Sequence, residues 1–198
     1  MLKRAFDLLA AGLALLVLAP VLAALALLVR LESPGPVLFR QPRVGKDGKP
    51  FTMYKFRTMR VDAQGEGGPA VPQVWDFKSY VFDPLYGGKQ YTRIGKFLRS
   101  TSLDELPNLL NVLRGDMSFV GPRPEVPELV EQYLPQYHRR HNVRPGITGL
   151  AQVSGRGSLT YEEAMHYDLE YVDDHSFVRD LAILARTVPT VLSRKGAR

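Results

Sequence analysis

The chain has 198 residues, which is enough for one compact domain with a short appendage and too few for two large domains. It contains no cysteine, which excludes a disulfide framework, a thiolate metal site and a cysteine nucleophile. Its formal charge of +6 favours an anionic partner such as a nucleic acid, a phospholipid surface or a phosphorylated substrate, and charge alone does not choose among them.

The first element is an unbroken apolar run from Leu8 to Val29, which has the length of a membrane span. Basic residues stand on both sides of the run, so the positive-inside rule does not favour crossing. Pro20 lies near its middle, where proline removes a backbone hydrogen bond and kinks a helix. We therefore expect a re-entrant helix-break-helix over residues 1–32. An ordinary spanning helix and a cleaved signal peptide are the alternatives.

A hairpin is predicted directly after this segment. Ser33-Pro34-Gly35-Pro36 ends the membrane element and begins the remaining domain. Residues 37–41 and 51–59 are β-like runs on either side of a loop with an Asp-Gly pair. Because side chains alternate along a strand, Lys55 and Arg57 share one face of the second run, which is therefore basic.

The rest of the domain, which spans residues 33–198, is predicted to be mainly helical. Residues 62–92 are predicted to form a mobile loop that is rich in Gly and Pro at its start, and the aromatic stretch within it has no assignable periodicity. Apolar spacing predicts helices from about Ser102 to Arg114, from Thr160 and from Ser176, the second opened by a capping box. The fold class is therefore α+β, mainly helical, with several amphipathic helices packed at the membrane interface.

Asp104 and Glu105 are adjacent carboxylates in the first turn of the helix predicted from Ser102. Unpaired N–H groups and the helix dipole favour negative charge there, so we expect both pKa values to be depressed. The local sequence alone favours a simpler interpretation, in which Asp104 is an N-cap and Pro107 stands where proline is tolerated.

Four arginines favour a chemical role instead, because each stands in a turn or at a helix end beside Gly or Pro. They are Arg99, Arg123, Arg144 and Arg156. A helix N-terminus with converging arginines matches the oxygens of a phosphate. A carboxylate there repels phosphate unless it attacks the phosphorus or holds a bridging divalent cation, for which Mg²⁺ is the expected ion. For any single arginine, a solvated basic face touching anionic lipid is the alternative.

Asp168 is a third carboxylate of interest, because it falls within the apolar stripe of the helix from Thr160. Burying an unpaired carboxylate is costly and implies an arginine or metal partner, so a structural salt bridge and a metal site are both open. The histidines show no spacing typical of a ligand set and are interpreted as surface or helix-end residues. They are His138, His141, His166 and His175.

The ordered motifs of the chain resemble the bacterial sugar transferases, also called monotopic polyprenyl-phosphate phosphoglycosyl transferases, in their short form. The resemblance covers nearly the whole chain, and its specificity lies in the ordered set. The matching segments are Lys3-Arg4-Ala5-Phe6-Asp7, Ser33-Pro34-Gly35-Pro36-Val37, Tyr54-Lys55-Phe56-Arg57-Thr58-Met59, Thr101-Ser102-Leu103-Asp104-Glu105-Leu106-Pro107-Asn108, Gly115-Asp116-Met117-Ser118, Val120-Gly121-Pro122-Arg123-Pro124, Arg144-Pro145-Gly146-Ile147-Thr148-Gly149, Gln152-Val153-Ser154-Gly155-Arg156, and Tyr167-Asp168 with Tyr171-Val172.

The resemblance implies transfer of a sugar 1-phosphate from a UDP-sugar to a polyprenyl (undecaprenyl) phosphate, with release of UMP, on the cytosolic face of the bacterial inner membrane. This would be the first membrane step of a glycan pathway. Asp104 would be the nucleophile that forms a phosphosugar intermediate, and Glu105 would assist with Mg²⁺. The proline break of the membrane helix would be Ala19-Pro20.

The same resemblance assigns further site residues. Lys55, Arg99, Arg123 and Asp168 would line the active site, and the Arg144 loop would belong to the phosphate-binding surroundings. Together with the patterns above, the predicted substrate- or phosphate-binding residues are Lys55, Arg57, Arg99, Arg123, Arg144 and Arg156, and the predicted metal ligands are Glu105 and Asp168.

Two other functions remain as alternatives. One is a non-catalytic basic peripheral membrane protein that binds anionic lipid, and the other is a nucleic-acid-binding domain on a membrane tether. The second is disfavoured because the arginines stand singly in Pro/Gly turns and the sequence has no nucleic-acid-binding motif. We therefore expect a UDP-sugar, a polyprenyl phosphate and the membrane as partners, and no nucleic acid.

Overall fold

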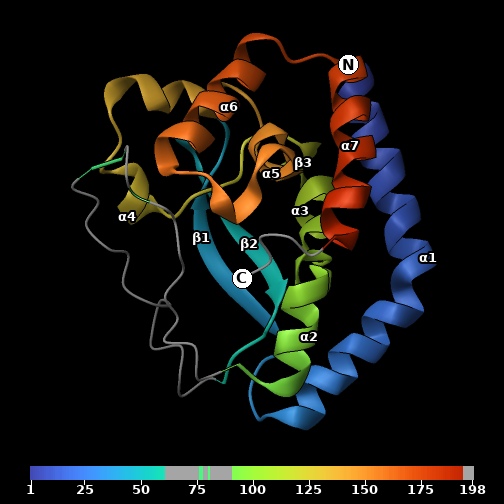
Figure 1. Ribbon diagram of the computed structural model, residues 1–198. Helices are drawn as coiled ribbons and strands as arrows, with labels where there is room; N and C mark the ends of the chain where they lie inside the picture. The colour runs from blue at the N-terminus through green and yellow to red at the C-terminus, as the bar shows by residue number, and fades with distance from the viewer. Residues whose placement is uncertain (61–75, 78–79, 81–90, 194–198) are drawn as a thin grey trace.

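The computed structural model describes residues 1–60, 76–77, 80 and 91–193 (Figure 1). In this part of the chain helices far outweigh strands, which confirms the α+β, mainly helical class. The strands form two small sheets, one antiparallel and one parallel. The elements are α1 (Leu2–Glu32), β1 (Leu38–Val44), η1 (Lys46–Gly48), β2 (Pro50–Phe56), α2 (Arg93–Thr101), η3 (Leu103–Glu105), α3 (Asn108–Arg114), β3 (Ser118–Val120), α4 (Pro127–Val130), η4 (Pro135–Asn142), β4 (Gly146–Thr148), α5 (Leu150–Ser154), η5 (Arg156–Ser158), α6 (Tyr161–Asp173) and α7 (Phe177–Leu192), where η marks a 3-10 helix.

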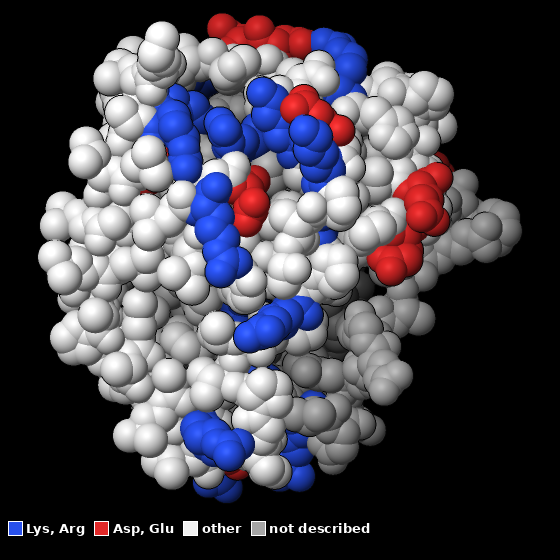
Figure 2. Space-filling model, turned by 180° about the vertical axis from the view of Figure 1, so that it is seen from behind, with Lys and Arg blue, Asp and Glu red and all other residues white. Residues whose placement is uncertain are grey.

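Helix α1 is long and apolar enough to cross a membrane by length and composition, and few of its residues are buried by the rest of the chain. Figure 1 shows it running beside α7 and then bending across the end of the domain near α2. Pro20 lies inside this one continuous helix and supplies a physical cause for the bend. Seen from behind, the side formed by α1 is largely free of charged side chains (Figure 2). The break predicted at Ala19-Pro20 therefore takes the form of a bent helix.

The N-terminal end of α1 is fastened to the domain by polar contacts. Lys3 Nζ lies 2.5 Å from Asp180 Oδ2, and Arg4 donates to the carbonyls of Val112 and Leu113. Asp7 is buried, and its Oδ1 accepts hydrogen bonds from β3. Three polar side chains in the first two turns thus hold this end against the domain.

The other end of α1 is held in a similar way. The buried guanidinium of Arg57 donates to the carbonyl oxygens of Ser33 and Pro34, at 2.6 and 2.8 Å, and so binds carbonyls at the end of the helix. The Glu32 carboxylate accepts hydrogen bonds from the backbone N–H groups of Arg93 and Ile94, at the start of α2. Both ends of the apolar helix are therefore attached to the same domain.

The predicted hairpin is confirmed as the antiparallel pair β1 and β2. Its strands differ from the prediction in length: β1 continues to Val44, and β2 runs from Pro50 to Phe56, so Arg57 lies just beyond it. The turn between the strands places Asp47 in the left-handed region, at φ 58°.

The predicted helix from Ser102 to Arg114 is wrong as a single element. Ser102 adopts a left-handed conformation, φ 59°, that ends α2, and η3 follows before α3 begins at Asn108. The helical spacing of the leucines concealed this break. Helix α2 itself was not predicted.

The two C-terminal helices are confirmed. Thr160 and Glu163 form the predicted capping box at the start of α6, and Ser176 caps α7. The apolar residues predicted to form one face of α7 are largely exposed, including Leu181, Val188 and Leu192. This face is therefore available to an apolar environment outside the chain.

The predicted mobile loop, residues 62–92, lies almost wholly outside the described residues. Among its described members, the carbonyls of Phe77 and Tyr80 accept hydrogen bonds from the first backbone N–H groups of α6. The rings of both residues lie about 5–6 Å from the ring of buried Tyr161. This small aromatic cluster forms part of the core beside the cavity described next.

Candidate active site

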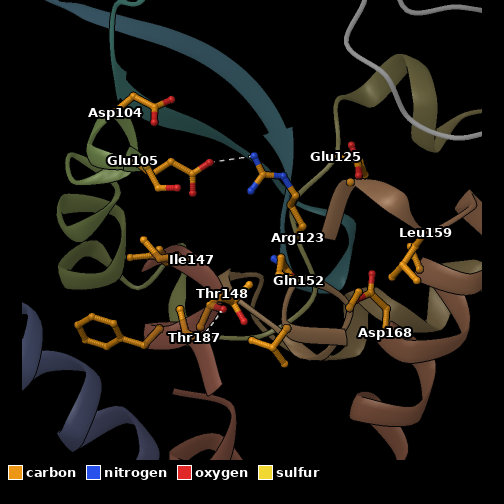
Figure 3. Close-up of a pocket in the computed structure, with 18 of the residues that line it drawn as sticks. Asp104, Glu105, Arg123, Glu125, Ile147, Thr148, Gln152, Leu159, Asp168 and Thr187 are labelled. Carbon is orange, nitrogen blue, oxygen red and sulfur yellow. Dashed lines mark hydrogen bonds and ion pairs between the residues drawn. The ribbon is translucent and has the colours of Figure 1, made fainter. Parts of the chain in front are cut away.

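A cavity of about 570 Å³ lies between η3 and the hairpin on one side and helices α5, α6 and α7 on the other. This volume is in the range typical of small-molecule sites. Figure 3 shows Asp104 and Glu105 at one end of the cavity and Asp168 at the opposite end, with Arg123 and Gln152 between them. The cavity therefore joins the carboxylates that the sequence singled out.

Glu105 is bound by two cations. Its Oε1 lies 2.8 Å from Lys55 Nζ and 2.9 Å from Arg123 NH2. Burial alone would raise the pKa of Glu105, but the charges of Arg123 and Lys55 and their hydrogen bonds hold that pKa well below its usual range. Glu105 is therefore ionised at neutral pH.

Asp104 is the neighbour of Glu105, but its carboxylate has a different environment. Its side chain is buried, and no hydrogen bond to its carboxylate is found in the part of the chain that the structure describes. Burial and the charge of Glu105 raise the pKa of Asp104, while Lys55, Arg99 and Arg123 oppose the rise. An unengaged carboxylate with a raised pKa thus faces the cavity.

These observations correct two expectations about the carboxylate pair. The prediction that a helix terminus depresses both pKa values is wrong for Asp104, whose pKa is raised. The pKa of Glu105 is depressed as predicted, but the cause is the charge of Arg123 and Lys55. The N-cap interpretation is also wrong, because α3 is capped by Pro107 and begins three residues after Glu105. The pair lies in a 3-10 turn, which has too few aligned peptides to act as a helix dipole.

Arg99 reaches the site from the last turn of α2. Its guanidinium carbon lies 5.5 Å from the centre of the Tyr91 ring, and its charge lowers the pKa of Asp104 against the effect of burial. Ser102 joins α2 to the Asp104 turn with φ at 59°, an uncommon conformation for a residue with a side chain. This junction turns the chain so that Arg99 and Asp104 both line the cavity.

Arg123 is held by its main chain. It lies in a segment where four successive carbonyl oxygens each accept a hydrogen bond from another part of the domain, and we call residues 122–125 the carbonyl arm. The contacts are Gly146 N to Pro122 O at 2.9 Å, Arg140 NH2 to Arg123 O at 2.6 Å, Arg43 NH1 to Pro124 O at 2.9 Å, and Val44 N to Glu125 O at 2.9 Å. The arm presents the Arg123 side chain to Glu105 from a fixed backbone.

Asp168 is paired with an arginine that the sequence analysis missed. Arg140 NH2 lies 2.5 Å from Asp168 Oδ2, and the same guanidinium donates to the hydroxyl of Tyr133. Arg140 and Asp168 are both buried. Burial raises the pKa of Asp168 to about 6, against the opposing charge of Arg140. Of the two partners left open for Asp168, the structure provides the arginine.

The sequence offered little to distinguish Arg140 from its neighbour. Arg139 and Arg140 are adjacent, yet Arg139 pairs with Asp173 at the surface while Arg140 turns inward. Only the three-dimensional path of η4 separates them.

The remaining predicted phosphate ligands lie elsewhere. Arg57 binds the end of α1, and the Nε of Arg144 donates to the Gly115 carbonyl at 2.8 Å, so neither side chain lines the cavity. Arg156 belongs to η5, and its side chain lies outside the described residues. The structure therefore brings together Lys55, Arg99 and Arg123, but not Arg57 or Arg144.

The histidines are placed as predicted with one exception. His141 is buried, because η4 turns it inward beside Arg140, and its ring stacks on Tyr133. Burial, together with the charges of Arg140 and His138, lowers the pKa of His141 to about 4. The other three are exposed. Within the described residues no group of three or more His, Asp or Glu side chains could hold a metal by itself.

The carboxylates nevertheless fit one kind of cation site. Mg²⁺ keeps several waters and is commonly bound by one or two carboxylates together with substrate phosphates. Asp104 has an unengaged carboxylate, and Glu105 engages its Oε1 with cations. Asp168 does not fit as a shared ligand, because it lies at the other end of the cavity and is paired with Arg140 (Figure 3).

Comparison with known proteins gives a consistent result. The family model described as "Bacterial sugar transferase" matches residues 1–194. The chain is 45% identical to UDP-glucose:undecaprenyl-phosphate glucose-1-phosphate transferase of Caulobacter vibrioides, over 98% of this chain and 71% of that protein. It is 46% identical to the exopolysaccharide production protein PSS of Rhizobium leguminosarum bv. phaseoli, over 98% and 96% respectively. The undecaprenyl-phosphate galactose phosphotransferase of Salmonella typhimurium is 39% identical over 99% of this chain and 41% of its own length.

Proposed function

The chain belongs to the bacterial sugar transferase family, and we propose that it transfers a sugar 1-phosphate from a UDP-sugar to undecaprenyl phosphate through a covalent intermediate on Asp104. The protein is an enzyme, a phosphoglycosyl transferase. The observation that carries the mechanism is the buried carboxylate of Asp104, which has no hydrogen bond within the described residues and stands beside Glu105 and its two cations.

In the first step, a carboxylate oxygen of Asp104 attacks the phosphorus that bears the sugar. A bond forms between that oxygen and phosphorus, and the bond from phosphorus to the bridging oxygen breaks, so the electron pair leaves with UMP. The sugar phosphate remains on Asp104 as an acyl phosphate. A carboxylate without hydrogen bonds keeps its lone pairs for this attack.

The cations around Glu105 would receive the diphosphate. Within the described residues, the Arg123 guanidinium makes one hydrogen bond, to Glu105, so its other N–H groups are available to phosphate oxygens. Arg99 and Lys55 add positive charge on the same side of Asp104, as their effect on its pKa indicates. These groups stabilise charge that develops on the phosphoryl oxygens and on the departing UMP.

Asp104 and Glu105 would hold Mg²⁺ together with the diphosphate. The ion would neutralise phosphate charge that otherwise repels the attacking carboxylate. Glu105, whose Oε1 is already fixed by Lys55 and Arg123, would orient this contact.

In the second step, a phosphate oxygen of undecaprenyl phosphate attacks the same phosphorus. The bond to Asp104 breaks, the free carboxylate is restored and the lipid-linked diphosphate sugar is released. This step needs the cavity to lie at the membrane, and the exposed apolar surface of α1 supports membrane association.

We further propose that α1 is re-entrant and that the domain lies on the cytosolic face. A straight helix of 31 residues is roughly 46 Å long, whereas the hydrocarbon core is about 30 Å thick. A spanning helix would therefore separate its two ends by a bilayer. Both ends contact one domain instead, through Lys3 and Asp180 at the start and Arg57 and Ser33 at the finish.

Activity is tested with purified protein in detergent, Mg²⁺, undecaprenyl phosphate and a panel of UDP-sugars, with UMP release as the readout. Incubation with a sugar-labelled donor but no lipid should leave about one label per protein. Asp104→Asn should lose both the label and turnover, while partitioning into membranes as the wild type does. Turnover by this variant would reassign the nucleophile.

Topology is tested by cysteine labelling, for which the absence of native cysteine is convenient. Single cysteines at Leu2 and Lys46, which are both exposed, should react with an impermeant reagent only after the cells are opened. Labelling of one position in intact cells would show that α1 spans the membrane.

A further inference from the structure

Gln152 is a side chain of the cavity wall that the proposed chemistry does not use. It belongs to α5 and lies beneath Arg123 in Figure 3, between the carboxylate pair and Asp168. Both polar atoms of its amide are buried, and neither has a hydrogen-bond partner within the described residues. A buried amide with an unused donor and an unused acceptor is uncommon and calls for an explanation.

The neighbours of Gln152 in the cavity wall are already paired. The hydroxyls of Thr148 and Thr187 are hydrogen-bonded to each other at 2.8 Å. Farther along, Asp168 is paired with Arg140. These groups have partners of their own, whereas a ligand can satisfy the Gln152 amide without breaking any contact found among the described residues.

The Gln152 amide does not cap the start of its own helix. Gln152 is the third residue of α5, from where a glutamine can reach back to the N-cap backbone. Its Oε1 lies 2.6 Å from the position that a Cβ on Gly149 would occupy, so the absence of a side chain at Gly149 leaves the amide its place. No hydrogen bond joins the amide to this helix start, however.

We propose that Gln152 is a specificity-determining residue that binds the UDP-sugar donor through a paired donor–acceptor contact. The proposal rests on the proposed function. A carboxamide presents N–H and C=O side by side. Two parts of the donor offer the complementary pair: the imide edge of uracil, with its N–H between two carbonyls, and neighbouring hydroxyls of the sugar. The sugar is attached directly to the diphosphate that Arg123 would bind, and uracil is separated from that diphosphate by the ribose.

Gln152→Met keeps the length of the side chain and removes both polar atoms. Gln152→Glu keeps the acceptor and removes the N–H donors. Gln136→Met is the matched control, because Gln136 is exposed on η4 and does not line the cavity. The three proteins and the wild type are compared by UMP release across donor concentrations, by inhibition with added UMP, and by their ranking of a UDP-sugar panel.

We expect Gln152→Met to lose about 10- to 100-fold in kcat/KM for the donor, mainly through KM, and Gln136→Met to stay within about twofold. If the amide contacts uracil, inhibition by UMP weakens in parallel and the sugar ranking is unchanged. If it contacts the sugar, inhibition by UMP is unchanged and the ranking changes. In either case the melting temperature without donor stays the same or rises, because an unpaired buried amide has been removed.

A folded Gln152→Met protein with wild-type kcat/KM, UMP inhibition and sugar ranking would overturn the proposal. So would a lower melting temperature with unchanged kinetics, which would assign the amide a structural role. Should Gln152→Met not fold, an unchanged donor KM in Gln152→Glu would overturn the proposal in its place. Failure of the proposed function looks different, because the wild type itself would then release no UMP from any donor.

Discussion

The cavity has an ionic cluster at each end, and the two clusters differ in how their charges are matched. At one end Arg140 faces Asp168, one cation to one anion, with the Tyr133 hydroxyl also engaged. At the other end Glu105 has two cations, while Asp104 next to it has no hydrogen bond in the described part of the chain. The balanced cluster is complete without a ligand, and the unbalanced one leaves groups for a ligand to engage.

The largest expected effect is on turnover and comes from removing Arg123, one of the two cations that bind Glu105. Arg123→Met should lower kcat about 10³-fold or more, because an arginine that stabilises charge in phosphoryl transfer contributes on that order. Arg139→Met is the control, since Arg139 forms a surface pair with Asp173. Steady-state UMP release measures both. Comparable losses in the two variants would show that Arg123 has no special role.

The next effect is on stability and concerns the balanced pair. Asp168→Asn leaves the buried charge of Arg140 without its partner and should cost about 3–5 kcal/mol in the free energy of unfolding. Urea unfolding in detergent measures this cost. Asp173→Asn, at the surface, should cost less than about 1 kcal/mol. If Asp168→Asn lowered the free energy of unfolding by no more than Asp173→Asn does, the Arg140–Asp168 pair would not be a stabilising cluster that is complete without a ligand.

A smaller effect is expected in the pH dependence of turnover. In the proposed mechanism the ionised form of Asp104 attacks the phosphorus, and the charge of Glu105 contributes to raising the pKa of Asp104. Glu105→Gln removes that charge, so the acid limb of the kcat profile should move to lower pH, in addition to a fall in kcat of roughly 100-fold. Profiles from pH 4 to 8 measure the shift. An acid limb that stays in place would indicate that another group controls it.

The smallest effect is a gain in stability when the unengaged carboxylate is neutralised. Because the pKa of Asp104 is raised by folding, the folded state holds its proton to higher pH than the unfolded chain, and stability falls as pH rises through that interval. At pH 7.5 Asp104→Asn should therefore melt at a higher temperature than the wild type, with the difference shrinking toward pH 4. A lower melting temperature would indicate that Asp104 stabilises the fold.

Much of the scaffold could be predicted from the sequence because its signals are local. The capping box at Thr160, the Ser176 cap and the hairpin each depend on a few neighbouring residues. The break at Ser102 could not be predicted, since the leucine spacing continues across it. The parallel pairing of β3 with β4 was also missed, because each strand has three residues and its partner lies far along the chain.

The candidate site was predicted in part. The positions of Asp104, Glu105, Lys55 and Arg123 around one cavity agree with the residues chosen from motifs. Which arginine faces the cavity depends on tertiary contacts that no motif reveals, and Arg57 is the clearest example. The raised pKa of Asp104 could not be predicted from the sequence either, because it results from burial and from the nearby Glu105 charge.

The carbonyl arm has a consequence for how such an enzyme can diversify. Its four contacts are made to main-chain oxygens, which every amino acid carries, so these contacts do not require an arginine side chain at position 123. The main chain of the arm is thus held at four successive carbonyl oxygens, whichever side chain stands at position 123. The residue at position 123 can therefore change without loss of the contacts that hold the loop presenting it.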